Sequence, residues 1–301
     1  MIFIGDRTHP ELSSELAKAL KMRAQFPQIH QFFDGERRVK LSKAVSGQDV
    51  VILKSFIAPT IDSSIIELCF VIDAAKHSKA KSVTVITPYF PYQRADRIFE
   101  TGEGIPLTVV ARMLESAGMD RVVILDPHID TLPNFFSIPV VVCSTVDLFV
   151  QQIQLLHSKY KKISLVSPDK GGKERVLELQ KHVKQADVVI LSKHRDHLTG
   201  KVSIRSHKGD ISDVCIVVDD MITTGNTIIE ATQYLISQGA EKVFVMATHP
   251  VFSGDTKILF SQSKIKEIYV TDSIDIPKKN RFKKLEILSI AHVLADITML
   301  K

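Results

Sequence analysis

The sequence predicts an α/β protein with two mostly parallel sheets, and two observations support this class. Short β-branched runs alternate with longer segments of helical periodicity, which is the pattern of successive βαβ units. About eight such runs suit two units better than a single sheet. We place the boundary at residues 144–145, which gives one domain of residues 1–144 and a second of residues 145–301.

The first half contains three predicted strands and two predicted helices. The strands are apolar runs at residues 49–55, 81–88 and 120–127. Residues 60–77 are expected to form an amphipathic helix, because apolar side chains recur on one helical face: Ile61, Ile65, Leu68, Cys69 and Ile72. A second helix over residues 106–118 begins at a proline and ends at a glycine, which are typical start and stop residues.

The second half repeats this organisation. Strands are predicted at residues 162–169, 186–192, 212–220, 241–250 and 265–273, and helices at residues 146–160 and 225–239. Residues 83–90 and 243–252 loosely echo one another, each a strand followed by a proline and an aromatic residue. This similarity suggests an internal duplication.

Composition narrows the class of protein. The 301 residues are 45% hydrophobic and 24% charged, which is ordinary for a soluble globular chain. Cys69, Cys143 and Cys215 lie in apolar stretches without metal-ligand spacing, so we expect buried thiols in a reducing compartment. The chain shows no charged leader and no apolar run of about 20 residues, so we expect a cytoplasmic protein with no membrane partner.

The net charge is +5, and the basic residues are scattered along the chain, with modest clusters at residues 157–162 and 277–284. This distribution favours solvated surfaces and a few phosphate-binding cations over a nucleic-acid partner.

The segment "VVDDMITTGNT", residues 217–227, is the strongest chemical signal in the chain. Asp219 and Asp220 are expected at the end of a strand, and the next helix should start within the hydroxyl-rich residues that follow. Free N–H groups and threonine hydroxyls at a helix start can bind a phosphate, while the two carboxylates can accept hydrogen bonds from sugar hydroxyls or hold Mg²⁺. A sugar phosphate satisfies both demands. The alternative is a strand end with ordinary turn and cap residues.

This segment resembles the phosphoribosyl-diphosphate loop of phosphoribosyltransferases and ribose-phosphate pyrophosphokinases. Segments similar to the pyrophosphokinase family follow one another along nearly the whole chain: residues 32–36, 87–97, 125–130, 166–176 and 247–254. Ordinary phosphoribosyltransferases lack such a first half. The resemblance implies two similar phosphoribosyltransferase-like domains, with the nucleotide motifs in the first and the ribose 5-phosphate loop in the second.

The resemblance also implies an activity. The family transfers the β,γ-diphosphoryl group of MgATP to the C1 hydroxyl of ribose 5-phosphate and releases AMP. By similarity, Asp219 and Asp220 hold the ribose hydroxyls, and the 5-phosphate binds the loop made of Thr223, Thr224, Gly225, Asn226 and Thr227. Two alternatives stay open: a phosphoribosyltransferase that uses the same loop, and a regulatory homologue with weak activity.

The ATP site is implied by residues of the first half. Phe33 is expected to cover the adenine and Asp34 and Glu36 to contact its polar edge, all from a neighbouring subunit of a homo-oligomer. The remaining ATP-binding residues implied are Arg94, Arg97 and His128. Taken alone, residues 33–36 are equally compatible with a hairpin turn. A Pro-His pair after a strand, such as residues 127–128, is typical of a structured turn when it is taken alone.

The catalytic residues implied are Lys193, Arg195 and His128, with Lys193 and Arg195 on the family's flexible loop. Cations placed there would meet the charge that gathers during phosphoryl transfer. The cofactor implied is Mg²⁺, with His128 and Asp169 as its protein ligands. Read without the family, residues 193–197 are a solvated turn.

Three positions depart from common family members. Thr223 stands where many have aspartate, Asn226 where many have glycine, and Ala95 where glutamine is usual. We expect Asn226 to preserve the loop, because asparagine tolerates a left-handed conformation. Residues 98–106 carry acids and no cation, and they resemble the archaeal-type branch more than members with a phosphate-dependent regulatory site.

Overall fold

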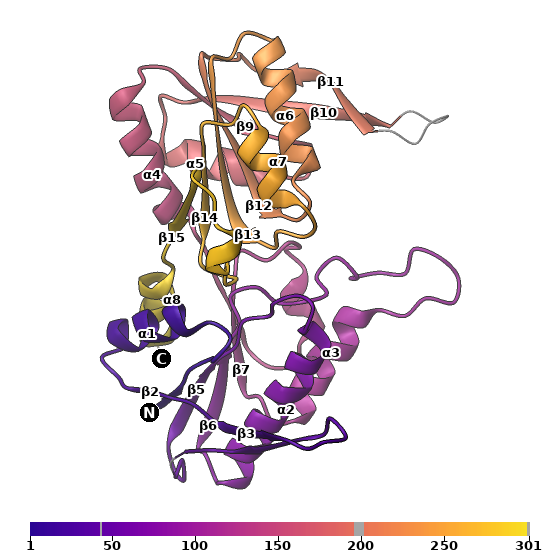
Figure 1. Cartoon of the computed structure of the whole chain (residues 1–301), viewed down its shortest axis with the longest axis vertical. Helices are drawn as coiled ribbons and strands as arrows, with labels where there is room; N and C mark the ends of the chain where they lie inside the picture. The colour runs from indigo at the N-terminus through magenta and orange to yellow at the C-terminus, as the bar shows by residue number, and fades with distance from the viewer. Residues whose placement is uncertain (43, 196–201, 300–301) are drawn as a thin grey trace. The chain divides into compact units, whose positions relative to one another are not determined.

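The computed structural model describes residues 1–42, 44–195 and 202–299 and divides the chain into two compact units (Figure 1). Unit 1 comprises Met1–Ser144, Ser273–Asp275 and Ser289–Lys301, and unit 2 comprises Thr145–Asp272 and Ile276–Leu288. The C-terminal residues 289–301 therefore differ from our domain prediction, which placed them in the second domain. Helix α8 (Ala291–Met299) packs on α1 (Pro10–Ala19), and the Ser289 hydroxyl donates to the Glu15 carboxylate.

Unit 1 is built on a six-stranded sheet in the order β2-β1-β5-β6-β7-β8. Every neighbouring pair is parallel. Its strands are β1 (Ile2–Ile4), β2 (Ala24–Gln25), β5 (Asp49–Leu53), β6 (Ser82–Ile86), β7 (Arg121–Leu125) and β8 (Val140–Cys143). Its other helices are α2 (Ile61–His77), α3 (Pro106–Ser116) and the 3₁₀ helix η1 (Leu132–Phe135). A separate antiparallel hairpin consists of β3 (Gln28–Gln31) and β4 (Arg37–Lys40).

Unit 2 is built on a seven-stranded sheet in the order β11-β10-β9-β12-β13-β14-β15, and only β10 and β11 pair antiparallel. Its strands are β9 (Ile163–Ser167), β10 (Asp187–Arg195), β11 (Val202–Lys208), β12 (Val214–Ile222), β13 (Lys242–Pro250), β14 (Glu267–Thr271) and β15 (Leu285–Leu288). Its helices are α4 (Val146–Lys159), α5 (Lys173–His182), α6 (Asn226–Ser237), α7 (Thr256–Gln262) and the 3₁₀ helix η2 (Lys278–Asn280).

The α/β class with mostly parallel sheets is confirmed, and each predicted strand and helix forms within a few residues of its expected bounds. The sequence analysis missed the strands of two to four residues, because so short a run shows no periodicity. It also missed the seven-residue strand β11 and the helices α1, α5, α7 and α8. The two sheets share one connectivity: β1-β5-β6-β7-β8 in unit 1 matches β9-β12-β13-β14-β15 in unit 2. This match is what an internal duplication would produce.

The apolar faces of the helices cover the sheets. In unit 1, the buried side chains of α2 and α3 form one core with β5, β6 and β7. Unit 2 has a core on each face of its sheet. Cys143 and Cys215 are buried as expected and Cys69 is partly exposed; all three are free thiols. Burial raises the pKa of both buried thiols to about 12.

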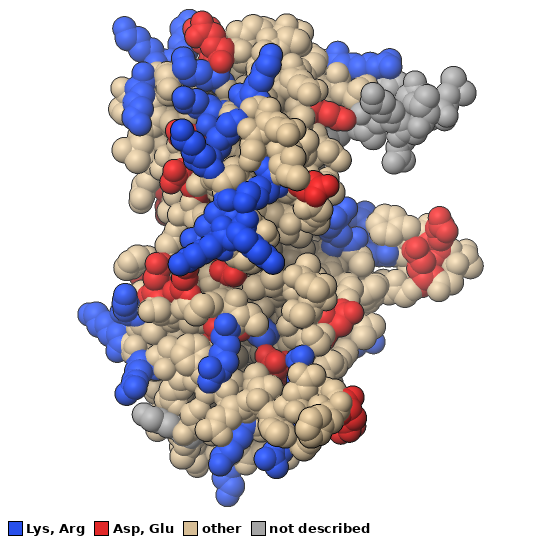
Figure 2. Space-filling view, viewed as in Figure 1, with Lys and Arg blue, Asp and Glu red and all other residues tan. Residues whose placement is uncertain are grey.

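Among the described residues, no helix combines the length and the apolar character needed to span a bilayer. Figure 2 shows lysine and arginine side chains gathered over part of unit 2. In the basic segment 277–284, Arg281 Nε donates to the carbonyl oxygen of Ile276 and Lys284 Nζ to that of Ser263. These two basic side chains therefore stabilise the backbone of unit 2.

Candidate functional site

The loop after β12 lies at the carboxyl end of the unit-2 sheet, where ligands of parallel α/β sheets bind. Strand β12 continues to Ile222, two residues beyond the end that we expected, because its register with β13 runs on to Pro250. The loop itself is residues 223–225, and α6 begins at Asn226. The backbone oxygen of Thr223 accepts hydrogen bonds from the Ser253 amide and the Thr256 hydroxyl, which fix the loop against the segment after β13.

The adjacent carboxylates Asp219 and Asp220 are in an unfavourable state without a ligand. Desolvation by burial, followed by the charge of Asp220, raises the pKa of Asp219 well above its ordinary value. Asp169 contributes in the same direction from the end of β9. Asp219 also accepts a hydrogen bond from the backbone N–H of Asp220 at 2.9 Å. A cation or a set of hydroxyl donors would relieve this concentration of negative charge.

The start of α6 can accept an anion. Its N-cap residue, Gly225, has no side chain to cap the helix, and the first turn carries no acid. The hydroxyl groups of Thr224 and Thr227 make no hydrogen bond within the described residues, so they remain available to a ligand. These groups and the free N–H groups of α6 together suit a phosphate.

Gly225, rather than Asn226, supplies the left-handed residue of this loop. Gly225 has φ +82°, and a Cβ placed on it would lie 2.7 Å from the ring of Phe260. Asn226 is the first residue of α6 and has no positive φ. The left-handed conformation that we expected at Asn226 is therefore found one residue earlier, at Gly225.

Asp169 is held in a turn after β9. Its Oδ1 accepts from the backbone N–H groups of Gly171 and Gly172, at 2.9 and 3.2 Å. Among the described residues, no three His, Cys, Asp or Glu side chains converge closely enough to hold a metal ion. Asp169 and the two acids of β12 nevertheless fit Mg²⁺, which commonly binds one or two protein carboxylates and takes its other ligands from phosphates and water.

Lys193 and Arg195 lie in β10, whereas we had expected a loop. The strand remains paired with β11 as far as Arg195, opposite Val202, with a bulge between Ser192 and Lys193. Residues 196–201, which include part of the segment that we predicted as a flexible loop, lie outside the described residues. The antiparallel pairing explains why residues 193–195 are extended here.

In unit 1, Phe33, Asp34 and Glu36 form the turn of the β3–β4 hairpin, which confirms the hairpin alternative for their local structure. The turn closes through hydrogen bonds from the Phe32 N–H to Glu36 O and from the Gly35 N–H to Phe32 O. The Asp34 carboxylate accepts from the Glu36 N–H at 3.1 Å. The Phe33 side chain is fully exposed.

The remaining unit-1 residues that we predict to bind ATP follow β6 and β7 in the chain. Arg94 borders a surface hollow of about 420 Å³, together with Tyr89 and Tyr92. Arg97 is exposed but not free, because its guanidinium binds both oxygens of Asp96 and lowers the pKa of that carboxyl. The charge of His128 is a smaller cause that also lowers the pKa of Asp96.

Gln93 is a structural residue of this region that the sequence analysis did not single out. It is fully buried, its Nε2 donates to Phe90 O, and its Oε1 accepts from the backbone N–H of His128 at 2.7 Å. Gln93 thereby ties the turn containing His128 to the loop containing Arg94. Gln93 lies inside residues 87–97, a segment similar to the pyrophosphokinase family, and this position was the signal that could have identified it.

Comparison with known proteins identifies relatives of both units. Residues 1–118 match a family model described as the N-terminal domain of ribose phosphate pyrophosphokinase, and residues 189–299 match the phosphoribosyl synthetase-associated domain. Ribose-phosphate pyrophosphokinases from Pasteurella multocida and Streptomyces avermitilis are each 34% identical to 98% of this chain, over 93% and 91% of their own lengths. The crystal structure of phosphoribosylpyrophosphate synthetase from Mycobacterium smegmatis superposes with a TM-score of 0.90 at 31% identity, covering 98% of this chain and 96% of that one.

Proposed function

This chain belongs to the ribose-phosphate pyrophosphokinase family and is an enzyme of that class, and we propose that it transfers the β,γ-diphosphoryl group of MgATP to ribose 5-phosphate. The C1 hydroxyl oxygen bonds to the β-phosphorus, the bond from that phosphorus to the bridging α,β-oxygen breaks, and the hydroxyl proton is released. The products are 5-phosphoribosyl 1-diphosphate and AMP.

The observation that best supports this proposal is the geometry at the end of β12. Two carboxylates under electrostatic strain precede a left-handed glycine and the uncapped start of a twelve-residue helix. We assign the ribose hydroxyls to Asp219 and Asp220 and the 5-phosphate to residues 223–227. Hydroxyl donors relieve the carboxylates, and the phosphate receives the N–H groups of α6.

The nucleotide is assigned to unit 1. Arg94, Arg97 and His128 would bind the ATP phosphates, and Arg97 must then share its guanidinium between Asp96 and the nucleotide. Phe33, Asp34 and Glu36 would cover an adenine bound to another copy of the chain in a homo-oligomer. The fully exposed Phe33 ring supports this part of the proposal, because an aromatic face without a neighbour suits stacking on a base.

Mg²⁺ would be held by Asp169, with His128 as a second candidate. When bound, it would neutralise charge on the transferring phosphates. An imidazole nitrogen is a less favoured ligand for Mg²⁺ than a carboxylate oxygen, so we rank Asp169 first. Lys193 and Arg195 would place positive charge beside the β-phosphorus and the departing oxygen of AMP.

The test is AMP release by the purified protein with ATP, Mg²⁺ and ribose 5-phosphate, with omission of each component as the control. Formation of AMP and phosphoribosyl diphosphate in equal amounts is the expected result. Ribose 5-phosphate binding without AMP release would instead indicate a regulatory homologue. Consumption of phosphoribosyl diphosphate with a purine base would indicate a phosphoribosyltransferase.

A further inference from the structure

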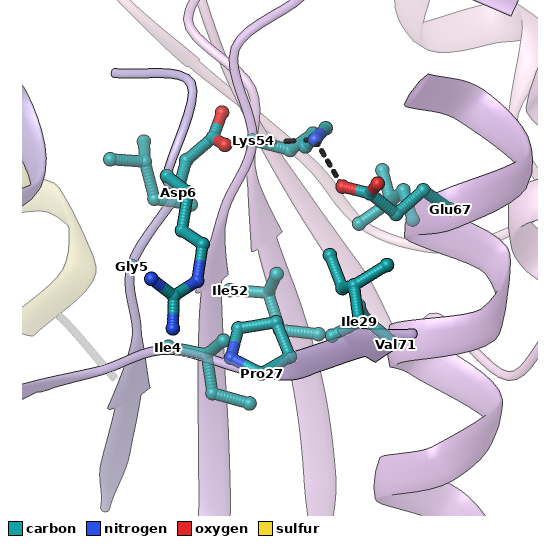
Figure 3. Close-up of a pocket in the computed structure, with 12 residues that line it drawn as sticks. Ile4, Gly5, Asp6, Pro27, Ile29, Ile52, Lys54, Glu67 and Val71 are labelled. Atoms are coloured by element: carbon teal, nitrogen blue, oxygen red, sulfur yellow. Dashed lines mark hydrogen bonds and ion pairs between the residues drawn. The ribbon is translucent and has the colours of Figure 1, made fainter. Parts of the chain in front are cut away.

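A buried ion-pair network in unit 1 has no role in the site described above (Figure 3). Lys54 follows β5, and its Nζ lies 2.9 Å from Oε1 of Glu67 and 3.6 Å from Oδ1 of Asp6. The side chain of Lys54 is only 5% exposed and that of Asp6 only 3%. Burial of a charged side chain is costly unless partners compensate it, so these groups depend on one another.

The two acids differ in what else holds them. Asp6 also accepts hydrogen bonds from the Ser55 N–H at 2.7 Å, the Thr8 N–H at 2.9 Å and the Thr8 hydroxyl at 2.7 Å. Asp6 is therefore fixed to the loops after β1 and β5 without help from lysine. Glu67 has only two partners within the described residues, Lys54 and Arg37.

Arg37 connects this network to the β3–β4 hairpin. It is the first residue of β4, and its Nη1 donates to Oε2 of Glu67 at 3.2 Å and to the Ser63 carbonyl oxygen at 3.4 Å. Glu67 thus binds the end of β5 with one oxygen and the hairpin with the other. Arg37 directly follows Glu36, so the bridge reaches the end of the turn that carries Phe33.

Apolar packing holds only the base of this hairpin. Val39 packs against the core of unit 1, and Ile29 lines a cavity of about 20 Å³ between the hairpin, β5 and α2. Such a volume accommodates about one water molecule, so packing beneath the hairpin is incomplete. The residues from His30 to Glu36 are all exposed. Orientation of the turn therefore depends on the polar link through Arg37.

We propose that Glu67 and Arg37 are positioning residues for the nucleotide, with Lys54 fixing the second oxygen of Glu67. They hold the β3–β4 hairpin at a fixed angle to the unit-1 sheet and thereby set the affinity for ATP without contacting it. This inference rests on the proposed function through the assignment of Phe33, Asp34 and Glu36 to adenine. It also predicts a measurable change in the hairpin that requires no activity.

The variants are Glu67→Gln, Arg37→Gln and the double variant, with Asp73→Asn as the matched control. Asp73 lies on the same helix, is 58% exposed and pairs only along α2 with His77 within the described residues. Each single variant should raise the KM for ATP about fivefold, with kcat and the KM for ribose 5-phosphate within about twofold of the parent. The double variant should add no further increase, because both changes break the same link. Arg37→Lys should recover part of the affinity.

Hydrogen exchange supplies the second readout. Amides of β3 and β4 should exchange faster in both single variants than in the parent, while amides of β5, β6 and β7 should exchange at the parent's rate. In the Asp73→Asn control, all of these amides should exchange at the parent's rate. If a variant binds ATP as tightly as the parent although β3 and β4 exchange faster, the inference is overturned. A uniform change in kcat, in both Michaelis constants and in the exchange of all amides would also overturn it, because that pattern indicates general destabilisation. If Glu67→Gln does not fold, Arg37→Gln decides, because its side chain is 27% exposed. An inactive parent would remove the proposed function while hydrogen exchange still tests the link.

Discussion

Replacement of Asp219 by asparagine should stabilise the protein without ligand and weaken its use of ribose 5-phosphate. Asparagine retains a side-chain oxygen that can accept the hydrogen bond from the Asp220 N–H. It removes one of two adjacent negative charges in a partly buried strand. The folded structure should therefore lose a repulsion and keep its local geometry.

The size of the effect follows from Coulomb's law. Two unit charges about 4 Å apart repel by about 4 kcal/mol at an effective dielectric constant of about 20. Partial exposure of both side chains screens this repulsion, so we expect a gain of about 1 kcal/mol, or about 2–4 °C in Tm. Loss of the charged acceptor should cost about 1–3 kcal/mol in ribose 5-phosphate affinity.

The gain in stability should depend on pH. The folded protein retains the Asp219 proton at pH values where the unfolded chain, with an ordinary pKa of 3.8, has lost it. Wild-type stability therefore falls as pH rises from 3.8 through the raised folded-state pKa, and the full cost is present only above that pKa. The asparagine side chain of the Asp219→Asn variant does not titrate, so the difference in Tm should grow as pH rises above 3.8 and vanish at pH values below 3.8.

Thermal unfolding followed by circular dichroism between about pH 4 and 9 measures this difference, and titration calorimetry measures sugar-phosphate affinity. Asp213→Asn is the matched control, because Asp213 is an exposed acid just before the same strand. A Tm at pH 8 equal to or below that of the parent would refute the electrostatic reasoning. Unchanged ribose 5-phosphate affinity would refute the assignment of Asp219 to the sugar.

Three further predictions test the catalytic strand, the loop and the regulation. Lys193→Ala should lower kcat about 10²–10⁴-fold with little change in KM, because we expect its charge to act mainly in the transition state. The control is Lys208→Ala, at an exposed lysine on β11. Equal rates of AMP release by the two variants would reject a catalytic role for Lys193. Gly225→Ala should lower the free energy of unfolding in urea by about 1 kcal/mol more than Gly239→Ala, because both residues have positive φ but only the first would clash with a ring. Equal losses would show that the loop relaxes around the added methyl group. Activity should not require added inorganic phosphate, and ADP should inhibit only in competition with ATP, because residues 98–106 carry acids where a dianion site needs cations; strict phosphate dependence in the AMP assay would contradict this.

The local sequence determined the long buried strands, the four longest described helices and the position of the β12–α6 loop. Buried parallel strands need continuous apolar runs, and surface helices need one apolar face, so both leave a signal within about ten residues. The same holds for the acids and hydroxyls of residues 217–227, which are neighbours in the chain. Their proposed roles in binding ribose 5-phosphate remain predictions.

Only the tertiary structure decided which distant residues meet. Phe260 makes glycine necessary at position 225 from 35 positions away, and α8 returns to unit 1 to cover the apolar face of α1. Lys54 follows β5 and meets Asp6, which follows the neighbouring strand β1 although 48 positions separate the two in the chain. Lys54 also joins Arg37 through Glu67, and none of these residues belongs to a recognisable motif. Long-range packing and charge compensation depend on where strands and helices are brought together in space, and local periodicity carries no record of those partners.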